Sequence, residues 1–144
     1  MFPELTAAAF LLALTVIVHA VGMMGLLRWV MRSHRMVGAR FWPVTWLLIR
    51  ITWSLIVIHF VEVAVWALYY WRQGCLPDLE SAFYFSGVTY TTVGYGDLVL
   101  PKEWRLLGPV EGLAGILMCG LSTGFFFAVF SKLYAAQKQE TQRE

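Results

Sequence analysis

The stretch TTVGYGDL, residues 91–98, places two glycines, three hydroxyl side chains and one carboxylate between two long apolar runs. Glycine and short polar residues at this density end a helix. Backbone that is not helical is tolerated at membrane depth only where it is buried in protein or lines a watery cavity. If the flanking runs cross a membrane, residues 91–98 must therefore line something.

The composition favours a membrane protein. Hydrophobic residues make up 59% of the 144 residues and charged residues only 14%, which is more apolar than an ordinary soluble domain. Because a bilayer needs about 20 apolar residues per helix, residues 5–30, 46–71 and 106–134 are predicted spans. Residues 79–90 form a fourth apolar run that would make a helix only about 18 Å long. We therefore predict an all-α membrane protein with three transmembrane helices, a re-entrant helix and a loop at 91–98. The first helix is expected to be retained rather than cleaved as a signal peptide, because no base precedes Arg28.

The basic residues predict an orientation. Residues between the first two spans carry bases and no acid, the tail after the third span is also basic, and residues 72–104 carry both signs. Basic loops stay in the cytoplasm. The N-terminus is therefore expected outside and the C-terminus in the cytoplasm, in a bacterial-type plasma membrane. The bases on which this prediction rests are Arg28, Arg32, Arg35, Arg40, Arg50, Lys132, Lys138 and Arg143.

The odd stretch has the composition of a cation site made from backbone oxygens. Gly94 and Gly96 can take a positive φ, which bulky residues rarely do. Alternation of such residues with ordinary ones lets successive carbonyls turn to one side, while Val93 and Tyr95 point backwards into packing. Thr92 would add a hydroxyl oxygen below this ladder. A row of partly negative oxygens can replace the water shell of a cation.

The short helix before the stretch fits the same purpose. Asp78 is a plausible N-cap after Pro77, and Glu80 suits the positive end of the helix. The other end, near Tyr90, carries orphan carbonyls and the negative end of the helix dipole. Aimed at a central cavity, this end would favour a cation.

The string TTVGYGD resembles the selectivity filter of the potassium channels. The resemblance covers about residues 44–135, as outer helix, pore helix, filter and inner helix, and leaves the first helix outside. It implies three regions: residues 1–40, the first helix with a basic linker; residues 41–135, the pore domain; and residues 136–144, a short polar tail. The residue reasoning reaches only a cation, and the resemblance supplies potassium.

The same resemblance implies roles for individual residues. Potassium would bind at the filter, with support from the residues on either side of it. Asp97 matches the acid behind the outer mouth, which in some relatives pairs with a glutamate on the pore helix; that position here is Val88, which cannot pair. The filter residues are Thr92, Val93, Gly94, Tyr95 and Gly96, with K⁺ at the first four, and the supporting residues are Thr91 and Asp97.

The chain has a single filter copy, and the same resemblance implies a homotetramer of such chains around a central pore. The expected partners are K⁺ ions and membrane lipids, with no nucleic acid and no cofactor besides the permeant ion. A passive potassium-selective channel is the leading hypothesis, and no enzymatic activity is expected. A less selective cation channel, or a regulatory subunit that needs a partner to form a pore, remain alternatives.

The inner helix offers a hinge and a pore-lining face. By resemblance Gly115 is where the helix bends, although Gly108 and Gly112, and likewise Gly120 and Gly124, have the spacing of close helix packing. Residues every three or four positions share one face, and Phe127 on that face could form an apolar constriction or simply face lipid. The predicted cavity residues are Ile116, Cys119, Thr123 and Phe127.

Ionisable residues inside the spans have two interpretations. His59 and Glu62 lie three positions apart on one helix face, and Glu111 is a second buried acid. They could form a proton-sensitive element, or Glu62 could tie the second helix to the pore helix through Ser86 or Thr89. The three histidines, His19, His34 and His59, look scattered along the sequence, so no metal cluster is expected. Cys75 is either a free loop thiol or the site of a disulfide between subunits.

Overall fold

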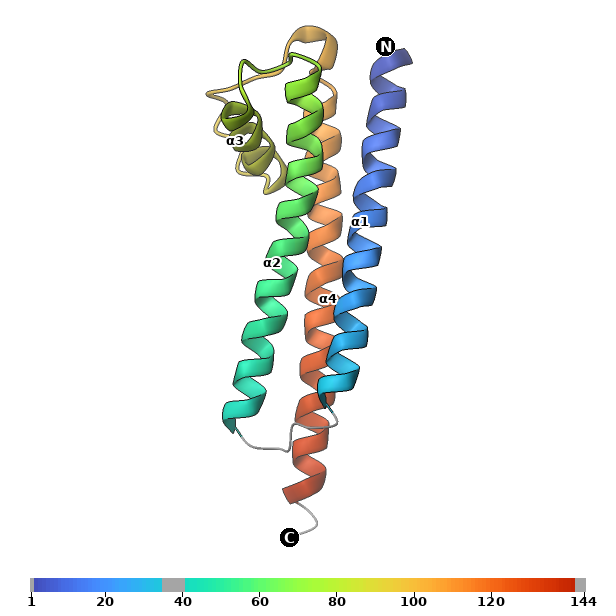
Figure 1. Ribbon diagram of the computed structural model, residues 1–144, viewed down its shortest axis with the longest axis vertical. Coiled ribbons are helices and arrows are strands. Elements are labelled where there is room, and N and C mark those ends of the chain that lie inside the picture. Colours follow the sequence, from blue (N-terminus) through green and yellow to red (C-terminus); the bar gives the residue numbers. More distant parts are fainter. Residues whose placement is uncertain (1, 35–40, 142–144) are drawn as a thin grey trace.

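The computed structural model describes residues 2–34 and 41–141, and these residues form helices joined by loops, with no strand among them. Figure 1 shows α1, α2 and α4 side by side along the long axis, with α3 beside the upper part of α2. The predicted all-α fold is confirmed. The elements are α1 (Phe2–His34), α2 (Phe41–Arg72), α3 (Leu79–Tyr90), a 3-10 turn η1 (Lys102–Trp104) and α4 (Leu107–Thr141).

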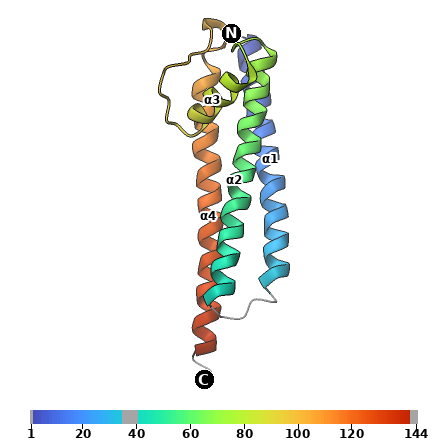
Figure 2. The same cartoon turned by 60° about the vertical axis from the view of Figure 1, so that its left-hand side comes forward.

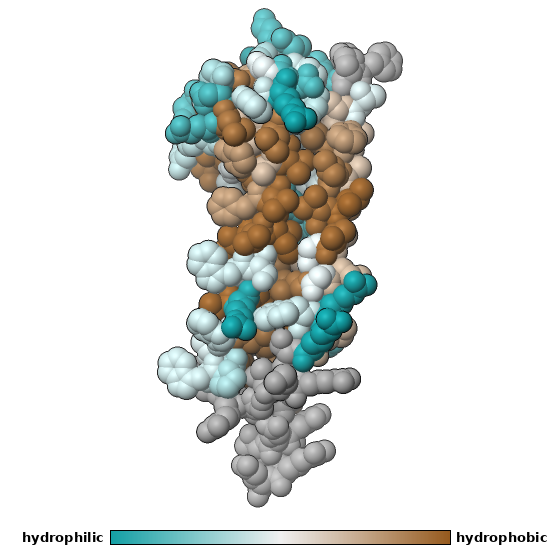
Figure 3. All heavy atoms as spheres, viewed as in Figure 1, coloured by the Kyte–Doolittle hydropathy of each residue, from teal (hydrophilic) through white to brown (hydrophobic). Residues whose placement is uncertain are grey.

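The three long helices in the described ranges are long enough to cross a bilayer. They contain 33, 32 and 35 residues, which at 1.5 Å per residue gives about 50 Å each, against about 30 Å of hydrocarbon. Figure 3 shows a broad apolar band with hydrophilic side chains above and below it. The apolar spans are Glu4–Arg32, Trp42–Arg72 and Lys102–Ala135, and each encloses a predicted one. Of the bases that predict the orientation, Arg35, Arg40 and Arg143 lie outside the described residues.

Helix α3 begins and ends at the residues predicted from the sequence. Asp78 has an extended backbone, and its side chain accepts a hydrogen bond from the Ser81 N–H at 2.8 Å, so it is the N-cap. That bond lowers the pKa of the Asp78 carboxyl. With 12 residues, α3 is too short to span, and Figure 2 shows its axis inclined to the long helices at one end of the bundle.

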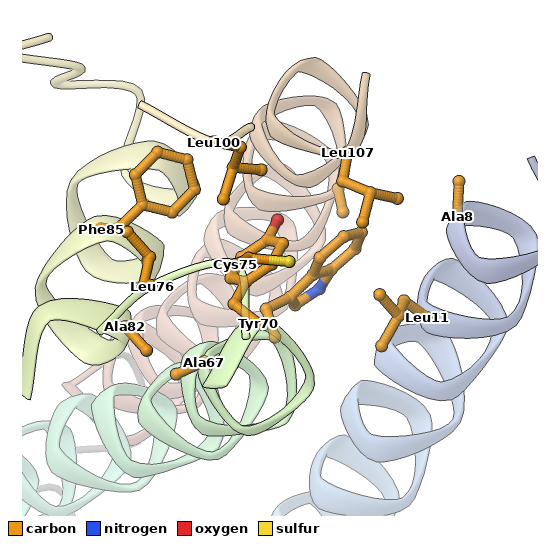
Figure 4. Packing of buried hydrophobic residues seen from close by; sticks show 12 residues of the cluster. Ala8, Leu11, Ala67, Tyr70, Cys75, Leu76, Ala82, Phe85, Leu100 and Leu107 are labelled. Atoms are coloured by element: carbon orange, nitrogen blue, oxygen red, sulfur yellow. The ribbon is translucent and has the colours of Figure 1, made fainter. Parts of the chain in front are cut away.

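An upper core joins all four helices to the loop before α3. Figure 4 shows Tyr70 of α2 near the centre, with Leu11 of α1, Phe85 of α3 and Leu107 of α4 around it. Cys75 is buried there as a free thiol, and burial raises its pKa. The buried members are Ala8, Leu11, Trp66, Ala67, Tyr70, Cys75, Leu76, Ala82, Phe85, Leu100, Leu107 and Ala114.

A lower core joins α1, α2 and α4 toward the other end. Its buried residues are Leu26, Val30, Leu47, Ile51, Leu55, Val129 and Leu133. Above this core α1 lies close to α2. A Cβ added at Gly22 would lie only 2.7 Å from the Ile58 side chain. The buried polar residues His19 and Glu62 lie on α1 and α2 between the positions that supply the two cores.

Helix α4 continues past residue 135, where the sequence suggested that a polar tail begins. The helix runs to Thr141. Alanine, glutamine, lysine and glutamate, which make up all of residues 135–140, are strong helix formers. The end of the hydrophobic span is therefore not the end of the helix.

Candidate functional site

The predicted filter segment begins where α3 ends, and hydrogen bonds fold it back onto the helix end. Thr91 is the C-cap: its N–H and its hydroxyl both donate to the Gly87 carbonyl, at 3.1 and 2.7 Å. The Gly94 N–H donates to the Val88 carbonyl at 3.0 Å. These bonds use carbonyls that the helix end would otherwise leave unpaired. Thr91 is thus held to the helix end, and its supporting role stays a prediction.

The backbone of the segment alternates in sign of φ. Thr92, Gly94 and Gly96 have φ of 62°, 52° and 77°, and they are every second residue. The prediction that the two glycines take a positive φ is confirmed. The positive φ of Thr92 was not foreseen, because a β-branched residue there costs about 1–3 kcal/mol. This alternation is what a ladder of carbonyls facing one side requires.

The side chains of the segment are open to the outside of the single chain. Val93 is 52% exposed and Tyr95 is 71% exposed, although the sequence suggested that both pack backwards. Large apolar groups are stabilised by leaving water. No described residue of this chain covers more than half of either side chain.

The acid at the end of the segment is held by α3. The Tyr84 hydroxyl donates a hydrogen bond to Asp97 Oδ2 at 2.8 Å. Val88, the position that the resemblance pointed to, is not the partner. Tyr84 lies one helical turn earlier and reaches the acid with its longer side chain. This pair could not be predicted from the sequence, since helical spacing does not say how a loop folds back.

Glycines on α4 allow the end of α3 to approach. A Cβ on Gly115 would lie 1.9 Å from the Tyr90 carbonyl oxygen, and one on Gly112 would lie 3.5 Å from a backbone oxygen of α3. This contact accounts for glycine at 115 without any bend, so the hinge stays a prediction. Gly120 and Gly124, also predicted as a packing pair, would meet nothing within 4 Å in the described part of the chain.

The predicted pore-lining residues share an uncovered face of α4. Ile116 and Phe127 are 57% and 68% exposed, and Cys119 and Thr123 are also exposed. The Thr123 hydroxyl donates to the Cys119 carbonyl at 2.9 Å, so this polar group is paired within the helix. The face is available to line a cavity, and its pore-lining role stays a prediction.

Glu111 ties three helices together in the upper part of the molecule. It is fully buried on α4 and accepts hydrogen bonds from the Tyr70 hydroxyl at 2.8 Å and from the Ser86 hydroxyl. Ser86 is also 3.0 Å from the Val63 carbonyl. Tyr70 and Val63 belong to α2 and Ser86 to α3, so this carboxyl group links α3 to both α2 and α4.

Glu62 makes a second such link, with partners other than the predicted ones. Its carboxyl oxygens lie 2.9 Å from His19 Nδ1 and 3.0 Å from His59 Nδ1, and the Tyr90 hydroxyl donates to one of them. The prediction that Glu62 ties α2 to α3 is confirmed, but the predicted partners Ser86 and Thr89 are wrong. Tyr90 is the pore-helix partner, because the last turn of α3 faces Glu62 and Ser86 faces Glu111.

The description of the histidines as scattered is also wrong. His19 and His59 are 40 positions apart in sequence, yet both meet the same carboxyl group. The side chain of His34 lies outside the described residues. His19 could have been singled out as an ionisable residue inside a predicted span, like His59. Its partner could not have been found, since that depends on how α1 is rotated against α2.

The known proteins that this chain resembles are ion channels. A family model described as "Ion channel" matches residues 55–132, more than half of the chain. The potassium voltage-gated channel protein Shal of Drosophila melanogaster is 30% identical over 97 residues, which are 63% of this chain and 17% of that protein. The A-type voltage-gated potassium channels KCND3 of Rattus norvegicus and Homo sapiens are 28% identical over 92 residues, 62% of this chain and 14% of theirs. The chain thus matches less than a fifth of the length of these relatives. No solved structure gives a significant match.

Proposed function

The chain belongs to the ion-channel family, and on this premise we propose that it forms a potassium-selective channel that conducts K⁺ passively. The relatives named above are potassium channels, and the filter string supports extending that ion to this chain. Their names also say voltage-gated. We do not extend voltage gating, because the match covers at most 17% of those proteins.

The observation that carries the proposal is the alternating backbone at Thr92, Gly94 and Gly96. With every second residue at positive φ, the carbonyls of the segment can face one axis. There they can replace the hydration shell of a cation. The proposed K⁺ ligands are the oxygens of Thr92, Val93, Gly94 and Tyr95, with Gly96 next to them. Thr91 and Asp97, each held to α3 by a hydrogen bond, would keep the two ends of this ladder in place.

Four copies of the chain are proposed to surround the pore. One chain supplies one strand of a filter, and its Val93 and Tyr95 side chains are more than half exposed. The α4 face that carries Ile116 and Phe127 is exposed as well. A closed ring of identical chains would cover all of these surfaces at once. The proposed orientation places the N-terminus outside and the C-terminus in the cytoplasm.

The test is a reversal potential in planar bilayers, with K⁺ on one side and Na⁺ on the other. We expect reversal near the potassium equilibrium potential for the purified chain. Gly94→Ala should abolish this preference, because alanine at a φ of 52° is strained by about 1–3 kcal/mol. Gly124→Ala is the matched control, since a Cβ there meets nothing within 4 Å in the described chain.

Other outcomes would support the alternatives. A current that reverses near zero would indicate a less selective cation channel. An absence of current together with a monomeric mass in mild detergent would indicate a subunit that needs a partner. A tetrameric mass for the chain alone would argue against that second alternative.

A further inference from the structure

Three helices meet at a set of side chains that could hold a metal ion and that lie outside the proposed filter segment. His19 comes from α1, and His59 and Glu62 come from α2; one ligand atom from each lies within 4.8 Å of the others. Glu62 is fully buried and His19 nearly so. Tyr90, the last residue of α3, donates a hydrogen bond to the same carboxyl group.

The donor set is typical of a borderline divalent metal ion. Two imidazole nitrogens and one carboxylate bind Zn²⁺ and its neighbours in the first transition series, whereas K⁺ and Mg²⁺ take oxygen ligands. Zn²⁺ holds such ligands at about 2.0–2.1 Å, which places neighbouring ligand atoms about 3.3 Å apart in a tetrahedron. His19 Nδ1 and His59 Nδ1 are 2.9 and 3.0 Å from the Glu62 oxygens. An ion could enter with small side-chain shifts, by replacing two N–H···O hydrogen bonds.

We propose that His19, His59 and Glu62 bind one divalent transition-metal ion per chain, of the class to which Zn²⁺ belongs. The Tyr90 oxygen is placed to supply the fourth donor, since it lies 3.0 Å from His59 Nδ1 and next to the Glu62 carboxyl group. A bound ion would fasten α1 to α2 and, through the Tyr90 oxygen, both of them to the end of α3.

The surroundings rank the two imidazoles as ligands. A metal-bound imidazole usually donates its other N–H to a fixed acceptor. His59 Nε2 lies 3.0 Å from the Ser122 hydroxyl of α4, which can accept this bond. His19 Nε2 is buried and has no partner among the described residues. His59 and Glu62 are therefore the stronger ligands, and loss of His19 should weaken the site less.

A cavity adjoins the site in the single chain. A cavity of about 630 Å³ lies between α2 and α3 and is lined by His59, Tyr90 and Cys119, among others. The side chain of His59 is 20% exposed, whereas that of Glu62 is fully buried. His59 would therefore contact an entering ion before the carboxylate does.

The test uses the full chain without a polyhistidine tag, purified in detergent and stripped of metal with a chelator. Titration with Co²⁺ should give one ion per chain and the strong visible absorption of a four-coordinate site, and Zn²⁺ should displace it. His59→Gln and Glu62→Gln should lose stoichiometric binding. His34→Gln is the matched control, because position 34 lies 15 residues beyond His19 on α1, about 22 Å along the helix, and it should bind as the wild type does.

A milder variant keeps the test decisive if a ligand variant does not fold. Ser122→Ala removes only the partner of His59 Nε2 and should weaken Co²⁺ binding by about 10–100-fold. Less than one Co²⁺ per wild-type chain, unchanged affinity in folded Ser122→Ala, or retained binding in folded Glu62→Gln would overturn the proposal. The site lies within one chain, and metal binding is measured without any current. A failure of the metal-site proposal can therefore be told apart from a failure of the proposed channel.

Discussion

Replacing Gly115 by alanine should push α4 away from the end of α3. The new Cβ would lie 1.9 Å from the Tyr90 carbonyl oxygen, and an ordinary contact is at least 3.4 Å. The two backbones must therefore separate by about 1.5 Å at this point. Both clashing groups are part of the main chain or fixed to it, so no side-chain rotation can relieve the contact.

The energy of this change can be bounded. Overpacking of a well-packed site costs about 1–3 kcal/mol, and the upper end applies because the obstacle is backbone. Alanine in place of glycine inside a helix returns about 1 kcal/mol. We therefore expect Gly115→Ala to lower the free energy of unfolding by about 2 kcal/mol. Because Tyr90 is followed directly by the filter segment, the K⁺ over Na⁺ preference should fall as well.

The assay is thermal unfolding in detergent together with the reversal potential in bilayers. Gly124→Ala on the same helix is the control, since its Cβ meets nothing within 4 Å in the described chain, and it should be neutral or stabilising by up to about 1 kcal/mol. Equal stability of the two variants would refute the close-approach reasoning. A stabilised Gly115→Ala with altered opening and unchanged selectivity would favour the hinge that the resemblance implies.

Three further changes test other contacts. Tyr84→Phe removes only the hydrogen bond to Asp97, which is worth about 1 kcal/mol at this exposed position. The steady-state K⁺ current should therefore fall roughly fivefold. An unchanged current would show that this bond does not hold the proposed filter in place. In Glu111→Gln, an amide N–H₂ group takes the place of one of the two carboxyl oxygens that accept hydrogen bonds from buried hydroxyl groups. Thermal unfolding should show a loss of about 1–3 kcal/mol in the free energy of unfolding, and the reversal potential should not change. Cys119→Ala leaves Cys75 as the one thiol of the chain. Because burial raises the pKa of Cys75, maleimide should label the native protein at least tenfold more slowly than it labels a small thiol at pH 7. A covalent dimer on a non-reducing gel would contradict a free thiol at Cys75.

The sequence predicted best what depends on local signals. The bounds of α3 were found because Asp78 caps its start and residues 91–98 cannot continue a helix. The three spans were found because hydropathy reports a membrane crossing directly. The positive φ of Gly94 and Gly96 followed from what glycine alone tolerates.

Contacts between helices could not be predicted in the same way. Helical spacing showed that His59 and Glu62 share a face, but the rotation of α1 that brings His19 to Glu62 is set by packing along the whole helix. Likewise Ser86 and Tyr90 both lie on α3, and only the angle of α3 decides which carboxyl group each of them meets. Which residues pair between two helices is therefore decided by the tertiary structure.

The two buried carboxyl groups connect the first helix to the residue that precedes the proposed filter. Glu111 links α3 to α2 and α4, within the part of the chain that the family model matches. Glu62 links the end of α3 to His19 on α1, which lies outside the matched region. Tyr90 thus meets α4 through its carbonyl, opposite Gly115, and meets Glu62 through its hydroxyl. A displacement of α1 that moves the carboxyl group would act on the residue directly before the proposed filter segment, through two hydrogen bonds that share the Glu62 carboxyl group.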